Sequence, residues 1–159
     1  MSDWITYLRP NVYLRDVAFS DLGDFFALEQ DLHPPVPVAK SQRNALAAYA
    51  ARWIPNLMDS TCTNRTVVWN DEIAGYVSCS NTMDQPALHL FIRKSHRQQG
   101  LGCQALHEML SHVLARPILA KTHTGNLAAI RLLLRCGFER CRDGDALDTG
   151  GGELVFELH

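Results

Sequence analysis

The sequence predicts a mixed α/β fold in which helices flank a twisted sheet. Short runs rich in β-favouring residues alternate along the chain with amphipathic helical patterns, and turn-forming residues separate the two. The chain has 159 residues, of which 47% are hydrophobic and 20% are charged, so it can bury one core of ordinary size. No compositional break marks a linker, and we expect a single domain over residues 1–159.

The N-terminal part predicts one strand and two helices. A strand is expected over residues 11–17, and Ser20 is placed to cap the helix that follows it. The prolines of segment 31–37 remove backbone donors and predict a loop. Ser41 can cap a second helix over residues 41–53, which Pro55 should close.

The rest of the chain predicts a hairpin followed by alternating strands and helices. Asn70, Asp71 and Glu72 are turn-forming residues between two β-favouring runs, 65–69 and 73–80, which indicates an antiparallel pair. The later expected elements are a strand over 87–92, a helix over 102–114, a strand over 117–123, a helix over 126–136 and a last strand over 153–158. The strands at 87–92, 117–123 and 153–158 are thus connected by helices, and such strand–helix–strand connections predict that the strands pair in parallel.

Composition excludes several classes of function. The net charge is −2 and no block of lysine or arginine occurs, so a nucleic acid partner is not expected. The five cysteines are odd in number and never stand as CxxC, which argues against a disulfide framework and against a metal site. No run of eighteen apolar residues and no signal-like N-terminus occurs. We expect a cytoplasmic protein that does not bind membranes.

The segment RQQGLG, residues 97–102, joins an expected strand to an expected helix. Gly100 and Gly102 allow a bulky anion to approach the unpaired N–H groups of a helix N-terminus, and Arg97 adds a full positive charge. The spacing alone equally fits a tight turn with a solvated arginine. A P-loop would need Lys-Ser/Thr after the second glycine, and a dinucleotide fingerprint would need a glycine at Ala105.

Three separated motifs resemble the GNAT N-acetyltransferase superfamily. The segment 97–102 is similar to its acyl-CoA motif, R/Q-x-x-G-x-G/A, and residues 13–28 are similar to its first strand and helix. The segment from Asn126 to Glu139 is similar to its later N-x-x-A-x-x-L-Y-x-x-x-G-F-E pattern. The resemblance covers residues 11–158. It implies a mostly antiparallel twisted sheet whose central parallel pair splays around acyl-CoA.

The resemblance also implies which residues hold acetyl-CoA, the expected co-substrate. Leu90 and Ile92 match the strand positions that pair with the pantetheine arm, and Asn126 matches a position that can bond it. Asn126 could equally serve as a helix N-cap. The pyrophosphate would lie on the backbone and side chains of the cradle, namely Arg97, Gln98, Gln99, Gly100, Leu101 and Gly102.

The implied reaction is direct transfer of an acetyl group to a primary amine. The sequence departs from the family here, because Leu133 stands at the frequent position of its acidic tyrosine, and Pro86 and Leu88 stand where a base is frequent. His89 is the nearest substitute for the base, although strand alternation points it to the opposite face from Leu88. A CoA-binding sensor without turnover is therefore an alternative function.

The acceptor is not specified by the sequence. Selectivity would come from the segment 32–53 and from the hairpin, regions that vary freely on such folds. Small-molecule amines, amino acids, peptides and protein N-termini remain open as acceptors, and a homodimer remains open as an assembly.

Overall fold

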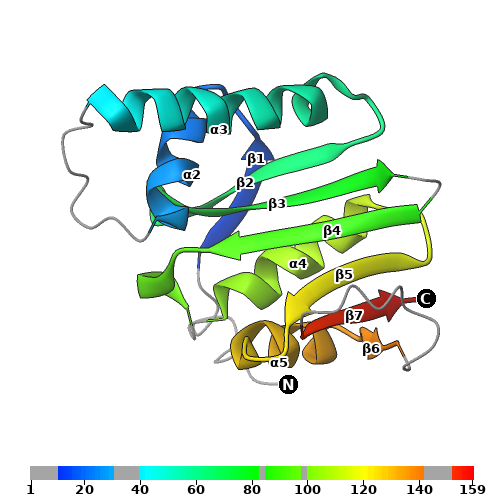
Figure 1. The fold of residues 1–159 in the computed structure, drawn as a ribbon. Coiled ribbons are helices and arrows are strands. Elements are labelled where there is room, and N and C mark those ends of the chain that lie inside the picture. Colours follow the sequence, from blue (N-terminus) through cyan, green and yellow to red (C-terminus); the bar gives the residue numbers. More distant parts are fainter. Residues whose placement is uncertain (1–10, 31–39, 83–84, 98–99, 142–151) are drawn as a thin grey trace.

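The computed structural model describes residues 11–30, 40–82, 85–97, 100–141 and 152–159. Within these ranges, four helices and a short 3-10 helix are arranged about one sheet (Figure 1). The elements, in chain order, are β1 (Val12–Asp16), α2 (Asp21–Glu29), α3 (Lys40–Met58), β2 (Thr63–Trp69), β3 (Glu72–Thr82), β4 (Gln85–Ile92), η1 (Lys94–His96), α4 (Leu101–His112), β5 (Ile118–His123), α5 (Leu127–Arg135), β6 (Glu139–Arg140) and β7 (Glu153–Leu158).

The sheet has seven strands in the order β1-β2-β3-β4-β5-β7-β6. Its one parallel pair is β4 with β5, and every other described neighbour pair is antiparallel. The mixed, mostly antiparallel sheet with a central parallel pair is confirmed. Helix α4 makes the crossover between β4 and β5, as the strand–helix–strand pattern predicts.

The prediction of a second parallel strand pair, between the strands on either side of α5, is wrong. Strand β7 runs antiparallel to β5, because a two-residue strand, β6, follows α5 and takes the direction of β5. β7 then inserts between β5 and β6 and pairs with both. Two residues are too few to show a strand period in sequence, so β6 was not predicted.

The β2–β3 hairpin has a two-residue turn. Asn70 and Asp71 have φ values of 50° and 64°, the left-handed region that a type I′ turn requires at both central positions. Glu72 already belongs to β3 and pairs with Trp69. The antiparallel hairpin is therefore confirmed, and its turn is one residue shorter than the sequence pattern indicated.

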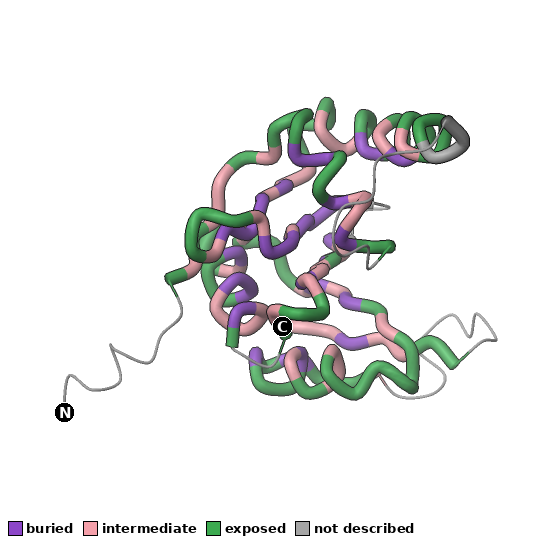
Figure 2. Tube along the Cα trace, turned by 90° about the vertical axis from the view of Figure 1, so that its left-hand side faces the viewer, coloured by how far each residue is buried: buried purple, intermediate pink, exposed green. Residues whose placement is uncertain are grey.

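Two hydrophobic clusters lie on opposite faces of the sheet. Alternate strand residues such as Val77, Leu88 and Ile92 pack with α4 and α5, whereas their neighbours Tyr76 and Phe91 pack with α2 and α3. Figure 2 shows buried segments along the strands and on the inner sides of the helices. The two faces of β4 therefore belong to different environments, which decides what each of its residues can contact.

Helix α3 does not end before Pro55, as the sequence predicted, but continues to Met58. The proline removes one helix hydrogen bond, and tertiary contacts hold the last turn in its place. The Asn64 side chain donates to the carbonyl of Asn56 at 3.1 Å, and Leu57 packs against the α2–α3 cluster. No helix in the described ranges is long and apolar enough to cross a membrane.

Helix α2 is fixed by a buried carboxylate at its first residue. Ser20 occupies the N-cap position but makes no capping bond with its side chain. Asp21, only 3% exposed, accepts hydrogen bonds from Arg15 at 2.6 and 2.8 Å, from the Thr66 hydroxyl at 2.8 Å and from the Ala18 N–H at 2.8 Å. Burial alone would raise the pKa of Asp21, but these bonds outweigh it and lower the pKa.

The predicted loop over 31–37 lies outside the described residues, as do most of the glycine-rich turn before β7 and the side chain of Ser41. Helix α4 begins one residue earlier than predicted, at Leu101, and ends at His112.

Candidate functional site

The site begins where β4 and β5 separate. The parallel register contains two pairs, Ala87 with Leu119 and Leu88 with Ala120. Beyond Leu88, β4 continues to Ile92 beside β3 and β5 continues to His123 beside β7, but the two strands no longer pair with each other. Figure 1 shows the two arrows diverging towards their carboxyl ends. The backbone groups of residues 89–92 that face β5 therefore lack a strand partner.

The N-terminus of α4 lies next to this separation. Gly100 is its N-cap residue, with φ 79° and ψ 4°, a left-handed conformation that glycine adopts without strain. In the described part of the chain no side chain caps this helix. The first N–H groups of α4 thus keep their donor capacity, and the helix dipole adds partial positive charge at the same point.

Gly102 allows α4 and α5 to approach closely. A Cβ built on Gly102 would lie 3.1 Å from Cδ2 of Leu132 and 3.7 Å from Cγ1 of Ile92. The absence of a side chain therefore brings the first turn of α4 against α5 and the end of β4. Each glycine of the RQQGLG segment thus has its own structural reason, a left-handed turn at Gly100 and helix packing at Gly102.

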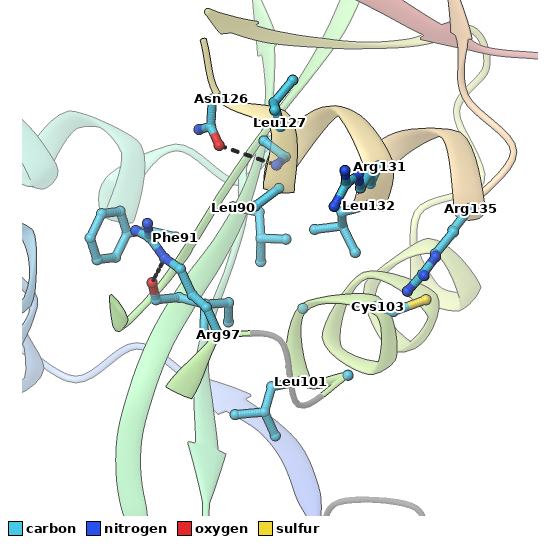
Figure 3. Close-up of a pocket in the computed structure, with 15 residues that line it drawn as sticks. Leu90, Phe91, Arg97, Leu101, Cys103, Asn126, Leu127, Arg131, Leu132 and Arg135 are labelled. Carbon is cyan, nitrogen blue, oxygen red and sulfur yellow. Dashed lines mark hydrogen bonds between the residues drawn. The ribbon is translucent and has the colours of Figure 1, made fainter. Parts of the chain in front are cut away.

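A pocket of about 680 Å³ joins these elements. Figure 3 shows that its walls come from the end of β4, the first turn of α4 and one side of α5. Three arginines line it, Arg97, Arg131 and Arg135, and among the described lining residues there is no carboxylate. Together with the α4 N-terminus, these cations make the pocket suited to an anionic ligand.

Arg97 lines the pocket beside the end of β4. Its Nε donates to the carbonyl of Ile92 at 2.9 Å, and its guanidinium lies 5.5 Å from the centre of the Phe91 ring (Figure 3). Both contacts anchor the stem of the side chain to β4. The terminal N–H groups of this exposed arginine can then donate to an anion.

Asn126 is the N-cap residue of α5, and its Oδ1 accepts from the Ala129 N–H at 3.2 Å (Figure 3). The capping role that the sequence left open is therefore confirmed. Because the cap uses only the oxygen, the Nδ2 group can donate to a ligand in the pocket. The two roles are compatible.

The pocket brings together most of the predicted binding residues. Leu90, Ile92, Arg97, Gly100, Leu101, Gly102 and Asn126 all line it. Gln98 and Gln99 lie outside the described residues.

Three further residues line the pocket that the sequence did not predict there, namely Cys103, Arg131 and Arg135. The two arginines stand four residues apart on α5, so their spacing was a signal that they share one helix face.

His89 does not line this pocket. It is the first β4 residue beyond the last pair with β5, and it lies opposite Ser78 of β3, on the face that carries Phe91. The His89 side chain is exposed, yet the surrounding protein removes part of its hydration, which together with the charge of Lys121 lowers its pKa. An imidazole of this kind is neutral at neutral pH and can accept a proton.

A second titratable group lies on the same face of the sheet. Tyr76 of β3 pairs with Phe91, and its hydroxyl donates to Oε1 of Glu29 on α2. Burial and the Glu29 carboxylate raise the pKa of Tyr76, so its phenol stays protonated at neutral pH. His89 and Tyr76 are diagonal neighbours in the β3–β4 register.

Leu133 offers no proton to the site. Its side chain is 6% exposed and packs in the cluster between α5 and the sheet. Leu132, one residue earlier, lines the pocket instead. An acid supplied from position 133 is therefore absent.

Comparison with known proteins adds a family and a fold. Residues 11–139 match the acetyltransferase (GNAT) domain family. No curated protein matches the chain.

Among solved structures, the ribosomal-protein-S18-alanine N-acetyltransferase of Escherichia coli is 19% identical, with a TM-score of 0.65 over 92% of both chains. The PaiA N-acetyltransferase of Thermoplasma acidophilum, solved with coenzyme A, is 12% identical, with a TM-score of 0.70 over 92% of this chain and 98% of its own. A Salmonella typhimurium acetyltransferase that modifies the N-terminal serine of ribosomal protein L7/L12 is 14% identical, with a TM-score of 0.69 over 95% and 96%.

Proposed function

We propose, from the premise that this chain belongs to the GNAT acetyltransferase family, that it transfers an acetyl group from acetyl-CoA to a primary amine. That the chain is an acyltransferase follows from the family. The donor, the acceptor and direct transfer between them are the proposal.

The observation that carries the proposal is the pocket at the β4–β5 separation. It combines an open helix N-terminus with three arginines, and it extends along the part of the β4 edge that lacks a strand partner. The chemistry of coenzyme A matches these features. Its anionic phosphates suit the arginines and the helix N-terminus, and the amide groups of its pantetheine arm can hydrogen-bond to the unpaired strand edge. A pocket of about 680 Å³ is also within the usual range for such ligands. The residues present therefore fit this co-substrate.

Each part of the pocket has a role in this proposal. The N–H groups at the start of α4, with Arg97, would bind the pyrophosphate, and Arg131 and Arg135 would add attraction for the remaining phosphate charge. Asn126 Nδ2 and the backbone of Leu90 would donate to the pantetheine arm. When bound, acetyl-CoA supplies an acetyl group already activated as a thioester.

Positioning would supply most of the rate. Those backbone donors of β4 beyond Leu88 that do not bond to β3 face the separation, where they can stabilise negative charge that develops on the thioester oxygen. Cys103 is on the first turn of α4, beside the proposed phosphate site. We propose direct attack by the amine rather than transfer through this cysteine, because the thioester of a bound acetyl-CoA lies at the far end of the pantetheine arm from the phosphates.

His89 is our candidate for the proton acceptor. It is the first β4 residue beyond the last pair with β5, at the start of the strand separation. A neutral imidazole at this place can take the proton that the attacking amine loses. With leucine at position 133, the thiolate would leave without an acid from α5.

The acceptor is proposed as a class, a primary amine of a small molecule or a peptide. Two structural neighbours acetylate ribosomal proteins, which makes protein N-termini a reasonable first panel. A homodimer and a cytoplasmic location stay predictions from the sequence.

The function is tested by incubating the full chain with acetyl-CoA and panels of amines. Release of free coenzyme thiol is followed continuously, and the acetylated product is identified by mass spectrometry. At least one class should give amine-dependent thiol release well above hydrolysis.

One observation favours a second candidate, a CoA-binding sensor without turnover. Among the described residues that line the pocket there is no histidine, carboxylate or tyrosine that could move a proton. Tight binding of coenzyme A, with no thiol release for any amine class, would support the sensor over the enzyme.

A further inference from the structure

Cys103, His107 and Cys136 form a cluster that the reaction does not use. The Sγ atoms of Cys103 and Cys136 lie 3.6 Å apart, and a ring nitrogen of His107 completes a set of three ligand atoms within 4.8 Å of one another. All five cysteines lie in the described part of the chain, and none forms a disulfide. No two of the cysteines have the CxxC spacing of a metal site, but the fold brings together Cys103 and Cys136, which are 33 residues apart in the sequence.

We propose that these three side chains form a binding site for Zn²⁺. The inference does not rest on the acetyl transfer proposed above. Two thiolates and one imidazole are a ligand set that Zn²⁺ prefers in proteins, with a fourth position open to water or a ligand.

The sulfur positions already suit a tetrahedral zinc ion. With Zn–S bonds of about 2.3 Å and tetrahedral angles, two thiolate sulfurs lie about 3.8 Å apart. The observed 3.6 Å is close to that value. His107 is exposed and stands four residues after Cys103 on α4, so both side chains lie on one side of the helix, and a change of rotamer can bring its nitrogen closer.

The backbone holds Cys136 in place. It is the C-cap residue of α5, and the chain leaves the helix in a Schellman motif. The Phe138 N–H donates to the Leu133 carbonyl at 3.0 Å, the Gly137 N–H donates to the Leu134 carbonyl at 3.2 Å, and Gly137 has φ 89°. Leu133 and Phe138 are both buried in the core. The second sulfur is therefore presented from a rigid helix end, not from a loop.

Charge balance is consistent with a dication at this place. Burial, with the neighbouring Cys103 thiol, raises the pKa of Cys136. Zn²⁺ would replace the two thiol protons, which pass to solvent, and would take neutral imidazole as its third ligand. One dication and two thiolates carry no net charge, so the nearby Arg131 and Arg135 do not oppose the filled site.

A metal ion bound at this site would stabilise the fold by cross-linking two helices. It would link the first turn of α4 to the end of α5, and both helices line the coenzyme pocket. Bound metal should therefore raise the melting temperature of the chain.

The test uses the full chain, purified without a polyhistidine tag and stripped with a chelator under reducing conditions. Zn²⁺ is titrated against a chromophoric chelator, and Co²⁺ is titrated separately to detect thiolate-to-cobalt charge-transfer absorption. We expect one ion per chain and clear charge transfer. The variants C103S and H107Q should each weaken Zn²⁺ binding by more than about tenfold. Removing a residue that only hydrogen-bonds to a metal ligand already lowers metal affinity by at least about tenfold, and these variants remove a ligand itself.

Matched controls are H112Q, a second exposed histidine on α4, and C62S, a cysteine from another part of the fold. Both should keep the affinity of the parent chain. Because H107Q changes an exposed side chain, it tests the site even if a cysteine variant folds poorly. The proposal is overturned if the chain binds no Zn²⁺ tightly, if binding survives both C103S and H107Q, or if Co²⁺ gives no charge-transfer band.

Discussion

Gly100 separates two explanations of the RQQGLG segment, a tight turn and an anion cradle. Its φ of 79° is left-handed, and a Cβ built there meets no atom within 4 Å, so a side chain at this position would point into open space at the pocket. In G100A the left-handed conformation should cost about 1–2 kcal/mol of stability. In G100N the cost should be smaller, because asparagine tolerates this region.

Coenzyme binding should respond differently from stability. Both variants add a Cβ that keeps a bulky anion from the α4 N–H groups, so both should lose at least one hydrogen bond to a charged group. Such a bond contributes about 1.5–3 kcal/mol, which corresponds to roughly 10-fold to 100-fold in the dissociation constant.

Calorimetry with coenzyme A measures the affinity, and urea unfolding measures the stability. Gly23 provides a control, because it lies in α2 away from the pocket, with no atom within 4 Å of a built Cβ. G23A should bind coenzyme A as the parent chain does. If G100N folds normally and keeps the parent affinity, Gly100 serves only the turn and the cradle argument fails.

Three further predictions follow from named contacts. A Cβ on Gly75 would lie 1.9 Å from the Phe91 carbonyl oxygen, so G75A should lower the free energy of unfolding by about 1–3 kcal/mol in urea titration. H89A should lower kcat/KM by about 100-fold at neutral pH. In a pH–rate profile of the parent chain, kcat/KM should rise with pH as His89 loses its proton, at a pH below the usual histidine pKa, and H89A should lack this rise. D21N should lose about 2–3 kcal/mol near neutral pH, as it breaks the charged hydrogen bonds from Arg15. Because the folded pKa of Asp21 is lowered, that stabilisation is present above the unfolded pKa and disappears as pH falls through the folded value.

Each of these three variants has a matched control variant, which tests whether the effect is specific to the substituted residue. G23A should slightly stabilise the chain where G75A destabilises it, because Gly23 is an exposed helical residue. H112A should keep the pH profile of the parent chain. If H89A lowers kcat/KM by less than about threefold, water rather than His89 accepts the proton of the attacking amine. D24N should lack the acid-dependent loss, because burial, with the charge of Asp21, raises the pKa of Asp24 instead of lowering it.

Local patterns in the sequence predicted the parts of the fold that depend on neighbouring residues. The β2–β3 hairpin followed from Asn70 and Asp71, and the strand–turn–helix around Gly100 followed from hydrophobic periodicity and two glycines. The end of α3 was missed because contacts of Asn56 with distant Asn64 override the local preference of Pro55. The position of β7 was missed for a similar reason, since pairing with two strands decides it.

The candidate site divides in the same way. The cradle residues are contiguous in sequence, so a motif could find them. Arg131, Arg135 and the pair Cys103–Cys136 depend on how α5 packs against α4, which Gly102 permits and no local pattern reveals. The role of His89 is still a prediction.

The most direct test of the account is a crystal structure of the full chain with coenzyme A. The account predicts the pyrophosphate on the first turn of α4 beside Arg97 and Gly100, and the pantetheine arm between β4 and β5 beyond Leu88. A coenzyme bound elsewhere on the chain, or β4 and β5 closed against each other with the arm outside the sheet, would contradict it.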